Sequence, residues 1–412
     1  MDPAQTPEAG PHVVVVGAGL AGLRTVERLR RLGHAGPVTM VGAEPLAAYD
    51  RPPLTKAALA ADETPTPPYL RAPEKYAELD VDLRLGVAAT ALDTGARALT
   101  LDDGSTLGYD ELVVATGSAA RRVAAWDVPG VHVLRTFDDL LRLRIELDGA
   151  ASVAVVGAGV LGCEVAATAR ERGLEVHLVD VEDRPLARVA PPQVGAWLAG
   201  IHAEQGVRLH LGSGVESLTD GPTLDLADET TLSPDLVVVA VGSVPSTDWL
   251  AGSDVDLDPA SGGVAVDERG ATSAPHVWAV GDIAAAPHPT GDGLLRLEHW
   301  TAAGDTAGRT AAFLLGQEPR LPAEVPYVWS DQFGLKLQTL GLPDADDELT
   351  VVAGDPAERS FLAVLAREGR VTGAVALAMP APLARCRTAV ADGEPLTDLL
   401  ARAPWERKKV SA

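Results

Sequence analysis

The feature that most limits how this chain can fold is an internal repeat. An apolar strand, a glycine turn and a helix occur at residues 12–32 and again at 152–172, with the glycines spaced G-x-G-x-x-G in both copies. A strand that passes through such a turn into a helix is typical of the first βαβ unit of a dinucleotide-binding fold. The repeat therefore predicts two nucleotide sites in one chain.

The first copy begins with the β-branched run Val13–Val16 and continues into helical apolar spacing from Leu20 to Leu32. Its glycines allow a tight turn, a close approach of the backbone to a pyrophosphate, and close packing of helix on strand; in that order they are Gly17, Gly19 and Gly22. The N-terminus of the helix would then face the anion. The next strand leads to Glu44, whose carboxylate is placed to accept hydrogen bonds from an adenosine ribose.

The second copy has the same parts. The glycines that follow its first strand are Gly157, Gly159 and Gly162. A further strand, Glu175–Val179, leads to Asp180 at the spacing expected for a ribose-binding acid. Three of the four residues from Asp180 to Asp183 are acidic, and they would repel a 2′-phosphate, so the pattern favours NADH over NADPH. Arg184 and Arg188 leave the use of both cofactors open.

Length and strand order predict the domain plan. A chain of 412 residues suggests about three domains. The apolar runs Leu112–Gly117, Leu236–Val241 and His276–Val280 are typical of buried parallel strands. If the last of these, which ends at Gly281-Asp282, belongs with the first nucleotide unit, the second unit is inserted into the first.

From Leu321 the pattern changes to mixed strands, at 327–342, 349–353, 360–366 and 371–378, with a short helix near 383–391. We therefore expect an α/β fold with two Rossmann-like nucleotide-binding domains, the second inserted in the first, and a C-terminal α+β domain. The expected boundaries are 10–118 and 244–320 for a FAD-binding domain, 119–243 for an NADH-binding domain, and 321–412 for the third.

The chain has only two cysteines, Cys163 and Cys386, and no CxxC or CxxxxC redox pair. Cys163 lies in the second fingerprint helix and is expected to be a buried core residue. Two dinucleotide sites without catalytic cysteines suggest that one nucleotide is a resident redox group and the other a diffusing hydride donor. FAD suits the first role and NADH the second, and we expect no metal site.

The formal net charge of −24 disfavours nucleic acid or an anionic membrane as a partner. The N-terminus lacks the basic region of a signal peptide, and no apolar stretch approaches the length of a membrane-spanning helix, so we expect a cytoplasmic protein. The oligomeric state is left open. Basic residues are grouped near the C-terminus, either as a docking patch or as a solvated tail: Arg385, Arg387, Arg402, Arg407, Lys408 and Lys409.

From about Val13 to about Phe361 the sequence resembles the pyridine-nucleotide-dependent ferredoxin reductases with a glutathione-reductase-like fold, such as putidaredoxin reductase and the reductases of aromatic-ring dioxygenases. The resemblance depends on both glycine fingerprints together with five further segments. These are Tyr49-Asp50-Arg51-Pro52-Pro53-Leu54-Thr55-Lys56, Val114-Ala115-Thr116-Gly117, Val280-Gly281-Asp282, Glu298-His299-Trp300 and Trp329-Ser330-Asp331-Gln332.

The resemblance implies roles for single residues. Lys56 would lie beside the flavin ring, Trp300 would pack near it, and Glu164 would lie near the nicotinamide and pair with Lys56. The alternatives without a catalytic role are a surface lysine for Lys56, a core tryptophan for Trp300, and for Glu164 an acid favoured at a helix N-terminus. Asp282 would bind the ribityl chain or act as a helix N-cap.

The full set of expected FAD contacts is Gly17, Gly19, Leu20, Ala21, Gly22, Glu44, Arg51, Lys56, Ala89, Thr116, Gly117, Arg135, Gly281, Asp282 and Trp300. The expected NAD contacts are Gly157, Gly159, Val160, Leu161, Gly162, Glu164, Asp180 and Gly242.

By the same resemblance, a hydride passes from NADH to FAD and single electrons then pass to a ferredoxin, expected to be of the two-iron two-sulfur type. That ferredoxin would serve a haem-thiolate monooxygenase or a ring-hydroxylating dioxygenase. Peroxide and disulfide reductases of similar fold are disfavoured, because no cysteine precedes Cys163. Rubredoxin reductase remains an alternative, as does a slow-turnover redox sensor that resembles the apoptosis-inducing flavoproteins.

Overall fold

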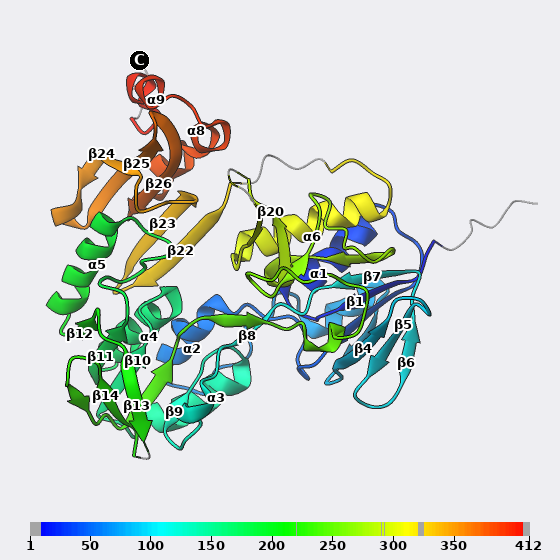
Figure 1. Ribbon diagram of the computed structural model, residues 1–412, viewed down its shortest axis with the longest axis horizontal. Helices are drawn as coiled ribbons and strands as arrows, with labels where there is room; N and C mark the ends of the chain where they lie inside the picture. Colours follow the sequence, from blue (N-terminus) through cyan, green and yellow to red (C-terminus); the bar gives the residue numbers. More distant parts are fainter. Residues whose placement is uncertain (1–9, 220, 290, 292, 320–324, 407–412) are drawn as a thin grey trace, which may run out of the picture. The chain divides into compact units, whose positions relative to one another are not determined.

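The computed structural model describes residues 10–219, 221–289, 291, 293–319 and 325–406 (Figure 1). The chain divides into two compact units, each assembled from three separate stretches. The first contains the described residues within 1–50, 67–119 and 243–324, and the second those within 51–66, 120–242 and 325–412. Each unit has a five-stranded parallel sheet, and the second also has a five-stranded antiparallel sheet. The expected fold class is confirmed.

The parallel sheet of the first unit has the strand order β19-β7-β1-β2-β3. Because side chains alternate along a strand, the valines of β1 serve two separate cores. Val13 and Val15 pack with the helices α1 and α6, while Val14 and Val16 pack toward a three-stranded antiparallel sheet, β4-β5-β6. A continuous apolar run is therefore what a strand covered on both faces needs.

The elements of the first unit have the following bounds. The strands are β1 (Val13–Val16), β2 (Val38–Gly42), β3 (Asp82–Leu85), β4 (Ala89–Asp93), β5 (Ala98–Leu101), β6 (Thr106–Gly108), β7 (Glu111–Val114), β8 (Ser118–Ala120), β17 (Ser243–Pro245), β18 (Val264–Ala265), β19 (Val277–Ala279), β20 (Ala284–Pro287) and β21 (Leu294–Arg296). The helices are α1 (Leu20–Arg31), α6 (Trp300–Leu314) and the 3₁₀ turns η2 (Pro73–Leu79), η4 (Asp248–Leu250) and η5 (Gly281–Ile283).

The parallel sheet of the second unit repeats this plan with the order β12-β11-β10-β16-β9. Its central strand β10 pairs in parallel with β11 and β16. Helix α4 packs on β10 and β11, and an antiparallel sheet, β13-β14-β15, contributes to the core that contains Ala154 and Val156. The repeat seen in the sequence is therefore a repeat of architecture.

The antiparallel sheet of the second unit, with the order β22-β23-β26-β25-β24, is the C-terminal domain. The run predicted as strand from 327 to 342 is two strands joined by a tight turn at Phe333-Gly334, where both residues have positive φ. The single helix predicted near 383–391 is two short helices, α7 and α8, and a further helix, α9, follows. Cys386, Leu383 and Leu399 hold these helices to the apolar core of the sheet.

The elements of the second unit have the following bounds. The strands are β9 (Val131–His132), β10 (Ser152–Val156), β11 (Glu175–Asp180), β12 (Arg208–Leu211), β13 (Val215–Thr219), β14 (Thr223–Leu226), β15 (Thr231–Leu232), β16 (Leu236–Val239), β22 (Tyr327–Gln332), β23 (Leu335–Gly341), β24 (Glu348–Asp355), β25 (Ser360–Arg367) and β26 (Arg370–Leu377). The helices are α2 (Ala57–Ala60), α3 (Phe137–Leu147), α4 (Val160–Glu171), α5 (Pro192–Glu204), α7 (Pro380–Ala384), α8 (Arg387–Asp392) and α9 (Leu396–Arg402), with the 3₁₀ turns η1 (Pro52–Thr55), η3 (Ala124–Trp126) and η6 (Pro356–Glu358).

In the part of the chain that the structure describes, no helix combines the length and the apolar character needed to cross a membrane.

The stretch 51–66, which carries η1 and α2, belongs to the second unit. Buried Arg144 of α3 holds it by donating from Nη1 to the carbonyl oxygens of Ala58 and Leu59, at 2.8 and 3.2 Å, and from Nη2 to that of Glu63 at 3.0 Å. Arg172, the C-cap of α4, donates to Leu59 as well, at 2.7 Å. These guanidinium groups satisfy carbonyls at the end of α2 that the short helix cannot satisfy itself.

Replacing Arg144 with methionine is therefore expected to lower the free energy of unfolding by about 2–4 kcal/mol, because three carbonyl groups lose a charged donor. Urea denaturation followed by circular dichroism measures this change. Arg142→Met is a matched control on the same helix: Arg142 is exposed and pairs only with Asp138 among the interactions found in the described residues. Its loss should change stability by no more than about 0.5 kcal/mol, and an equal loss in both variants would contradict the assigned role of Arg144.

Candidate functional site

The glycine turns of the two units have the same geometry. A Cβ atom added to Gly17 would lie 2.1 Å from the carbonyl oxygen of Ala115, and one added to Gly157 would lie 2.4 Å from that of Ala240. Both glycines have positive φ, at +120° and +108°. Neither position can hold a side chain without moving the neighbouring strand, so the glycine is required by the turn itself.

The third glycine of each turn is required by packing. A Cβ atom on Gly22 would lie 1.9 Å from the oxygen of Gly17, and one on Gly162 would lie 1.8 Å from the oxygen of Gly157. Only a bare Cα lets the first turn of α1 or α4 come this close to the strand that precedes it.

The middle glycines, Gly19 and Gly159, differ from the other two in each turn. A Cβ atom on either would meet no described protein atom within 4 Å, and both have ordinary negative φ. Each is the N-cap of its helix, and no described side chain caps that end. Free N–H groups at a helix N-terminus beside an open Cα fit the pyrophosphate of a dinucleotide. Both sites therefore suit the cofactors expected from the sequence.

In the first unit, Glu44 follows β2 and accepts a hydrogen bond of 2.5 Å from the hydroxyl of Tyr49. Trp300 is the first residue of α6, and its indole nitrogen donates to Asp50 at 2.7 Å. Next to it, Nδ1 of His299 is buried without a hydrogen-bond partner among the described residues, and burial lowers the pKa of this histidine. A buried polar atom usually has a hydrogen-bond partner. The unsatisfied Nδ1 of His299, next to the indole of Trp300, therefore fits a site in which a bound polar ring system supplies that partner.

The remaining FAD candidates of the first unit lie at the ends of strands or in the first turn of α1. Gly281 and Asp282 form the 3₁₀ turn after β19, and the N–H of Gly281 donates to Thr306 at 3.0 Å. The hydroxyl of Thr116 donates to the carbonyl oxygen of Ser246 at 3.0 Å. The others are Leu20 and Ala21 in α1, Ala89 at the start of β4, and Gly117 after β7.

A polar cluster in the first unit was not foreseen. Arg296 donates to the hydroxyl of Ser118 and to the carbonyl oxygen of Asp282, both at 3.0 Å, and also bonds Glu298. Ser243 donates to Glu298 as well. The sequence signal was the segment Glu298-His299-Trp300, in which only the tryptophan had been given a role.

In the second unit, Asp180 ends β11 and holds the glycine turn. Its carboxylate accepts hydrogen bonds from the backbone N–H of Ala158 and, at 2.9 Å, from that of Glu182. Two backbone donors therefore fix this carboxylate beside the turn. Arg184, the basis of the alternative use of NADPH, pairs with Asp183 at 2.7 Å. The NAD candidates Val160 and Leu161 open α4, and Gly242 follows β16.

Lys56 and Glu164 form an ion pair in the second unit, with Nζ 3.0 Å from Oε1. The carboxylate of Glu164 is buried and also accepts from the hydroxyl of Thr55 at 2.6 Å, the hydroxyl of Ser330 at 3.0 Å and the N–H of Asp331 at 3.1 Å. The lysine has a second acid, Asp331, at 3.4 Å. A buried carboxylate with four donors is fully satisfied, so the pair has one defined geometry.

The sequence did not indicate the partners of this pair. Thr55 and Asp331 lie within segments that carried the resemblance, but no role had been given to them. They reach Glu164 across 109 and 167 residues of sequence, a separation at which no local spacing rule applies. Only the resemblance of two segments could have pointed to them: Tyr49–Lys56, which contains Thr55, and Trp329–Gln332, which contains Asp331.

Arg51 and Arg135, both expected at FAD, are in contact within the second unit. Nη1 of Arg51 donates to the carbonyl oxygen of Arg135 at 2.6 Å, and the N–H of Arg135 donates to Asp139 of α3 at 3.0 Å. With Lys56, these are the three FAD candidates that lie outside the first unit.

Cys163 is buried in α4, as expected, and its thiol donates to the carbonyl oxygen of Ala158 at 3.2 Å. Desolvation, with Asp180 and Glu164 nearby, raises the pKa of this thiol strongly. Burial also raises the pKa of Cys386 to about 11. Since the thiolate is the reactive form, burial and the raised pKa make both thiols poor nucleophiles at neutral pH.

Thiol reagents are therefore expected to leave the native enzyme active, and Cys163→Ala should retain its NADH oxidation rate within about twofold, because the thiol takes no part in electron transfer. The measurement is NADH oxidation with an artificial acceptor before and after treatment, with thiol counts on native and denatured protein. Labelling that inactivates the native wild-type protein but spares the alanine variant would show instead that Cys163 is reactive.

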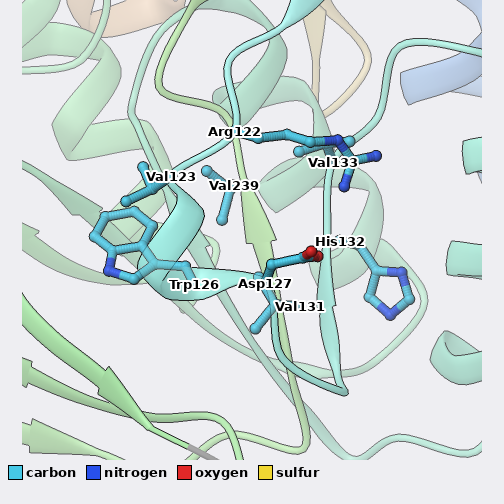
Figure 2. A pocket seen from close by; sticks show the side chains of 8 residues that line it. All are labelled: Arg122, Val123, Trp126, Asp127, Val131, His132, Val133 and Val239. Atoms are coloured by element: carbon cyan, nitrogen blue, oxygen red, sulfur yellow. The ribbon is translucent and has the colours of Figure 1, made fainter.

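A separate pocket opens beside the β9 edge of the second parallel sheet (Figure 2). Val123, Trp126, Val131 and Val239 form its apolar side, and Arg122, Asp127, His132 and Val133 complete it. Nε2 of His132 lies 2.8 Å from a carboxylate oxygen of Glu146. None of the lining residues is a predicted cofactor contact.

Two parallel sheets, each with an open glycine turn at a helix N-terminus, define an oxidoreductase of the two-dinucleotide class. A family model of pyridine nucleotide-disulphide oxidoreductases matches residues 11–307, and a reductase C-terminal model matches residues 327–404. The chain belongs to the pyridine nucleotide-disulphide oxidoreductase family, which uses FAD and NAD(H).

Within this family, the chain is similar along nearly its whole length to proteins named as ferredoxin reductases. The chain is 36% identical over 390 residues to the ferredoxin reductase component of a chlorobenzene dioxygenase from Cupriavidus sp., which covers 92% of this chain and 93% of the relative. It is 35% identical over 374 residues to the ferredoxin–NAD(+) reductase subunit of a benzene 1,2-dioxygenase system from Pseudomonas putida, at 90% of each chain. Putidaredoxin reductase, solved in covalent complex with putidaredoxin, matches with a TM-score of 0.88 and 31% identity over 97% of this chain and 100% of that one.

Proposed function

We propose that this chain is an NADH-dependent ferredoxin reductase. The observation that carries the proposal is the pair of open glycine turns, one in each parallel sheet, in a chain whose relatives along nearly its whole length are named ferredoxin reductases. In this proposal residues 10–118 and 244–320 bind FAD, residues 119–243 bind NADH, and residues 321–412 form the third domain.

When bound, FAD accepts a hydride from NADH and passes the two electrons singly to two one-electron acceptors. The residues of this chain hold and orient the reactants. Gly19 and Gly159 leave room for the two pyrophosphates, and the N-termini of α1 and α4 face them. The carboxylate of Asp180, held beside the turn, would repel the 2′-phosphate of NADPH, which favours NADH.

Lys56 is assigned to the flavin ring, where its ammonium would stabilise negative charge that develops on reduction. Glu164 fixes the position of that ammonium through the 3.0 Å ion pair and would orient the nicotinamide. Trp300, held by Asp50, supplies a flat face against the ring system. None of these side chains acts as a nucleophile, so each contributes position and charge.

The acceptor is proposed to be a two-iron two-sulfur ferredoxin that serves an oxygenase. The names of the relatives support a ferredoxin of a dioxygenase system, and the putidaredoxin complex supports a small carrier protein. The described members of the C-terminal basic group contribute to the domain itself: Arg385 donates to the carbonyl oxygen of Trp405 at 3.1 Å, and Arg402 pairs with Glu394 at 2.5 Å. Arg407, Lys408 and Lys409 lie outside the described residues.

The test is an anaerobic titration of the purified protein, followed by its visible spectrum, first with NADH and then with NADPH. An oxidised-flavin spectrum that NADH bleaches at far lower concentration than NADPH supports both cofactor assignments. A colourless protein that FAD does not reconstitute would contradict the proposal. Reduction of a dioxygenase ferredoxin, with a rate that falls as salt rises, then separates a ferredoxin reductase from a slow-turnover redox sensor.

A further inference from the structure

A buried chain of hydrogen bonds leads from helix α5 to the carboxylate of Glu164. His202 Nε2 lies 2.7 Å from Oε1 of Gln332, whose amide nitrogen donates to the hydroxyl of Ser330 at 2.8 Å. That hydroxyl donates to Oε1 of Glu164 at 3.0 Å. All four side chains are almost fully buried, and all four belong to the second unit.

The charge of Glu164 determines the direction in which the hydrogen bonds of this buried network donate. Beside the Lys56 ammonium an ionised carboxylate only accepts, so the single hydroxyl hydrogen of Ser330 points to Glu164. Ser330 must then accept from the amide nitrogen of Gln332, which turns the amide oxygen toward His202. His202 therefore carries its proton on Nε2, and each group in the chain donates toward the carboxylate.

The surroundings of His202 fit this neutral, Nε2-protonated form. Its side chain has no exposed surface, and Nδ1 is buried without a hydrogen-bond partner among the described residues. Desolvation lowers the pKa of the ring, and the bond to Gln332 opposes this shift.

The turn between β22 and β23 also contacts the ring of His202. Phe333 packs edge-on against His202, with the ring centroids 5.0 Å apart and the planes at 74°. It occupies a left-handed backbone position, φ +52°, that a bulky residue rarely adopts. Ser330 and Gln332 lie two residues apart on β22 and so present their side chains on the same face.

We propose that His202 and Gln332 are positioning residues for hydride transfer: through Ser330 they fix Oε1 of Glu164, and through Glu164 they fix the ammonium of Lys56. The inference rests on the function proposed for the Lys56–Glu164 pair, and adds that the C-terminal domain and α5 set the geometry of that pair. Neither residue touches a reacting atom.

Three variants of the FAD-loaded protein test the role of this hydrogen-bond network. Gln332→Met keeps the length of the side chain but removes both hydrogen bonds, and His202→Phe keeps a flat ring against Phe333 but removes the donor. Each should lower the limiting rate of flavin reduction by NADH about tenfold in anaerobic stopped flow and leave the apparent Kd for NADH within about twofold. His202→Gln restores an N–H near the position of Nε2 and should recover the rate.

Two further readouts separate positioning from a general structural role. The double variant His202→Phe with Gln332→Met should be no slower than Gln332→Met alone, because both changes break the same chain. Nitrogen NMR of histidine-labelled protein, with or without FAD, should show the Nε2–H form of His202 and a changed signal in Gln332→Met. His210→Phe is the matched control, since His210 of β12 lies within hydrogen-bond distance of His177 and has no described contact with the hydrogen-bonded residues from His202 to Glu164.

Glu164→Gln, measured in parallel, distinguishes the two ways to fail. If it slows flavin reduction while Gln332→Met and His202→Phe behave like wild type, the positioning role is overturned and the proposed function stands. If Glu164→Gln itself leaves the rate of flavin reduction unchanged, the role proposed for the Lys56–Glu164 pair is overturned, and the positioning role with it. The NMR signal of His202 then shows only whether the hydrogen-bond network is present. A rate that His202→Gln does not recover, at unchanged thermal stability, also counts against the inference.

Discussion

Gly159→Ala is expected to give a yellow, stable protein that NADH no longer reduces. The added methyl group meets no described protein atom within 4 Å and the backbone has negative φ, so folding is not affected. The same methyl group occupies the space assigned to the pyrophosphate of NADH, and the apparent Kd should rise on the order of 100-fold or more, which corresponds to about 3 kcal/mol.

The equivalent change in the first unit should give the opposite pattern. Gly19→Ala also meets open space, so the protein should fold, but it should purify without FAD. Visible spectra, FAD content and thermal melting of the two variants measure both effects. Loss of FAD from Gly159→Ala, with FAD retained in Gly19→Ala, would exchange the two cofactor assignments.

Gly22→Ala and Gly162→Ala are the contrasting controls. Their methyl groups would lie within 2 Å of a backbone oxygen of the preceding turn, so these variants should lose stability as well as cofactor. The comparison separates a glycine needed for packing from a glycine needed for a ligand.

Lys56→Met is expected to have the second large effect, on both rate and stability. It leaves the buried carboxylate of Glu164 with its three hydrogen bonds but without a counter-charge. Breaking a buried pair on one side costs about 3 kcal/mol of stability. Loss of the positive charge assigned to the flavin ring should slow flavin reduction by NADH about 100-fold.

Lys336→Met is the matched control for this change. Lys336 is more exposed than Lys56 and pairs with Asp331 at 3.3 Å, an acid that it shares with Lys56, but among the described residues it makes no ion pair or hydrogen bond with Glu164. Its loss should alter the stability by less than about 1 kcal/mol. Stopped-flow reduction and urea unfolding measure both variants; equal rates in Lys56→Met and wild type would remove Lys56 from the mechanism.

Much of the fold was predictable because its determinants are local. The run Val13–Val16 and its counterpart in the second unit are apolar on both faces, which only a covered parallel strand satisfies. Burial of Cys163 was predictable from its helix. The predicted strands 112–117, 236–241 and 276–280 were each too long at the C-terminal end, because pairing stops before the glycine turns; the last also began one residue early.

The C-terminal domain was predicted less well for a related reason. Its strands have clear periodicity, but the turn at Phe333-Gly334 carries no proline or asparagine signal, and a phenylalanine is unfavourable in the left-handed region. The contact of that phenylalanine with His202 accounts for its place there, and no sequence rule contains this contact.

By itself, then, the sequence determined that there are two dinucleotide folds, which glycines form their turns, and that no cysteine pair carries electrons. These properties depend on spacing within about 20 residues. The tertiary structure decided that the stretch 51–66 joins the second unit, that Thr55, Ser330 and Asp331 complete the shell of Glu164, and that His202 ends a buried chain leading to it. These contacts join residues about 80 to 170 positions apart along the chain, and burial selects them only once the sheets have packed.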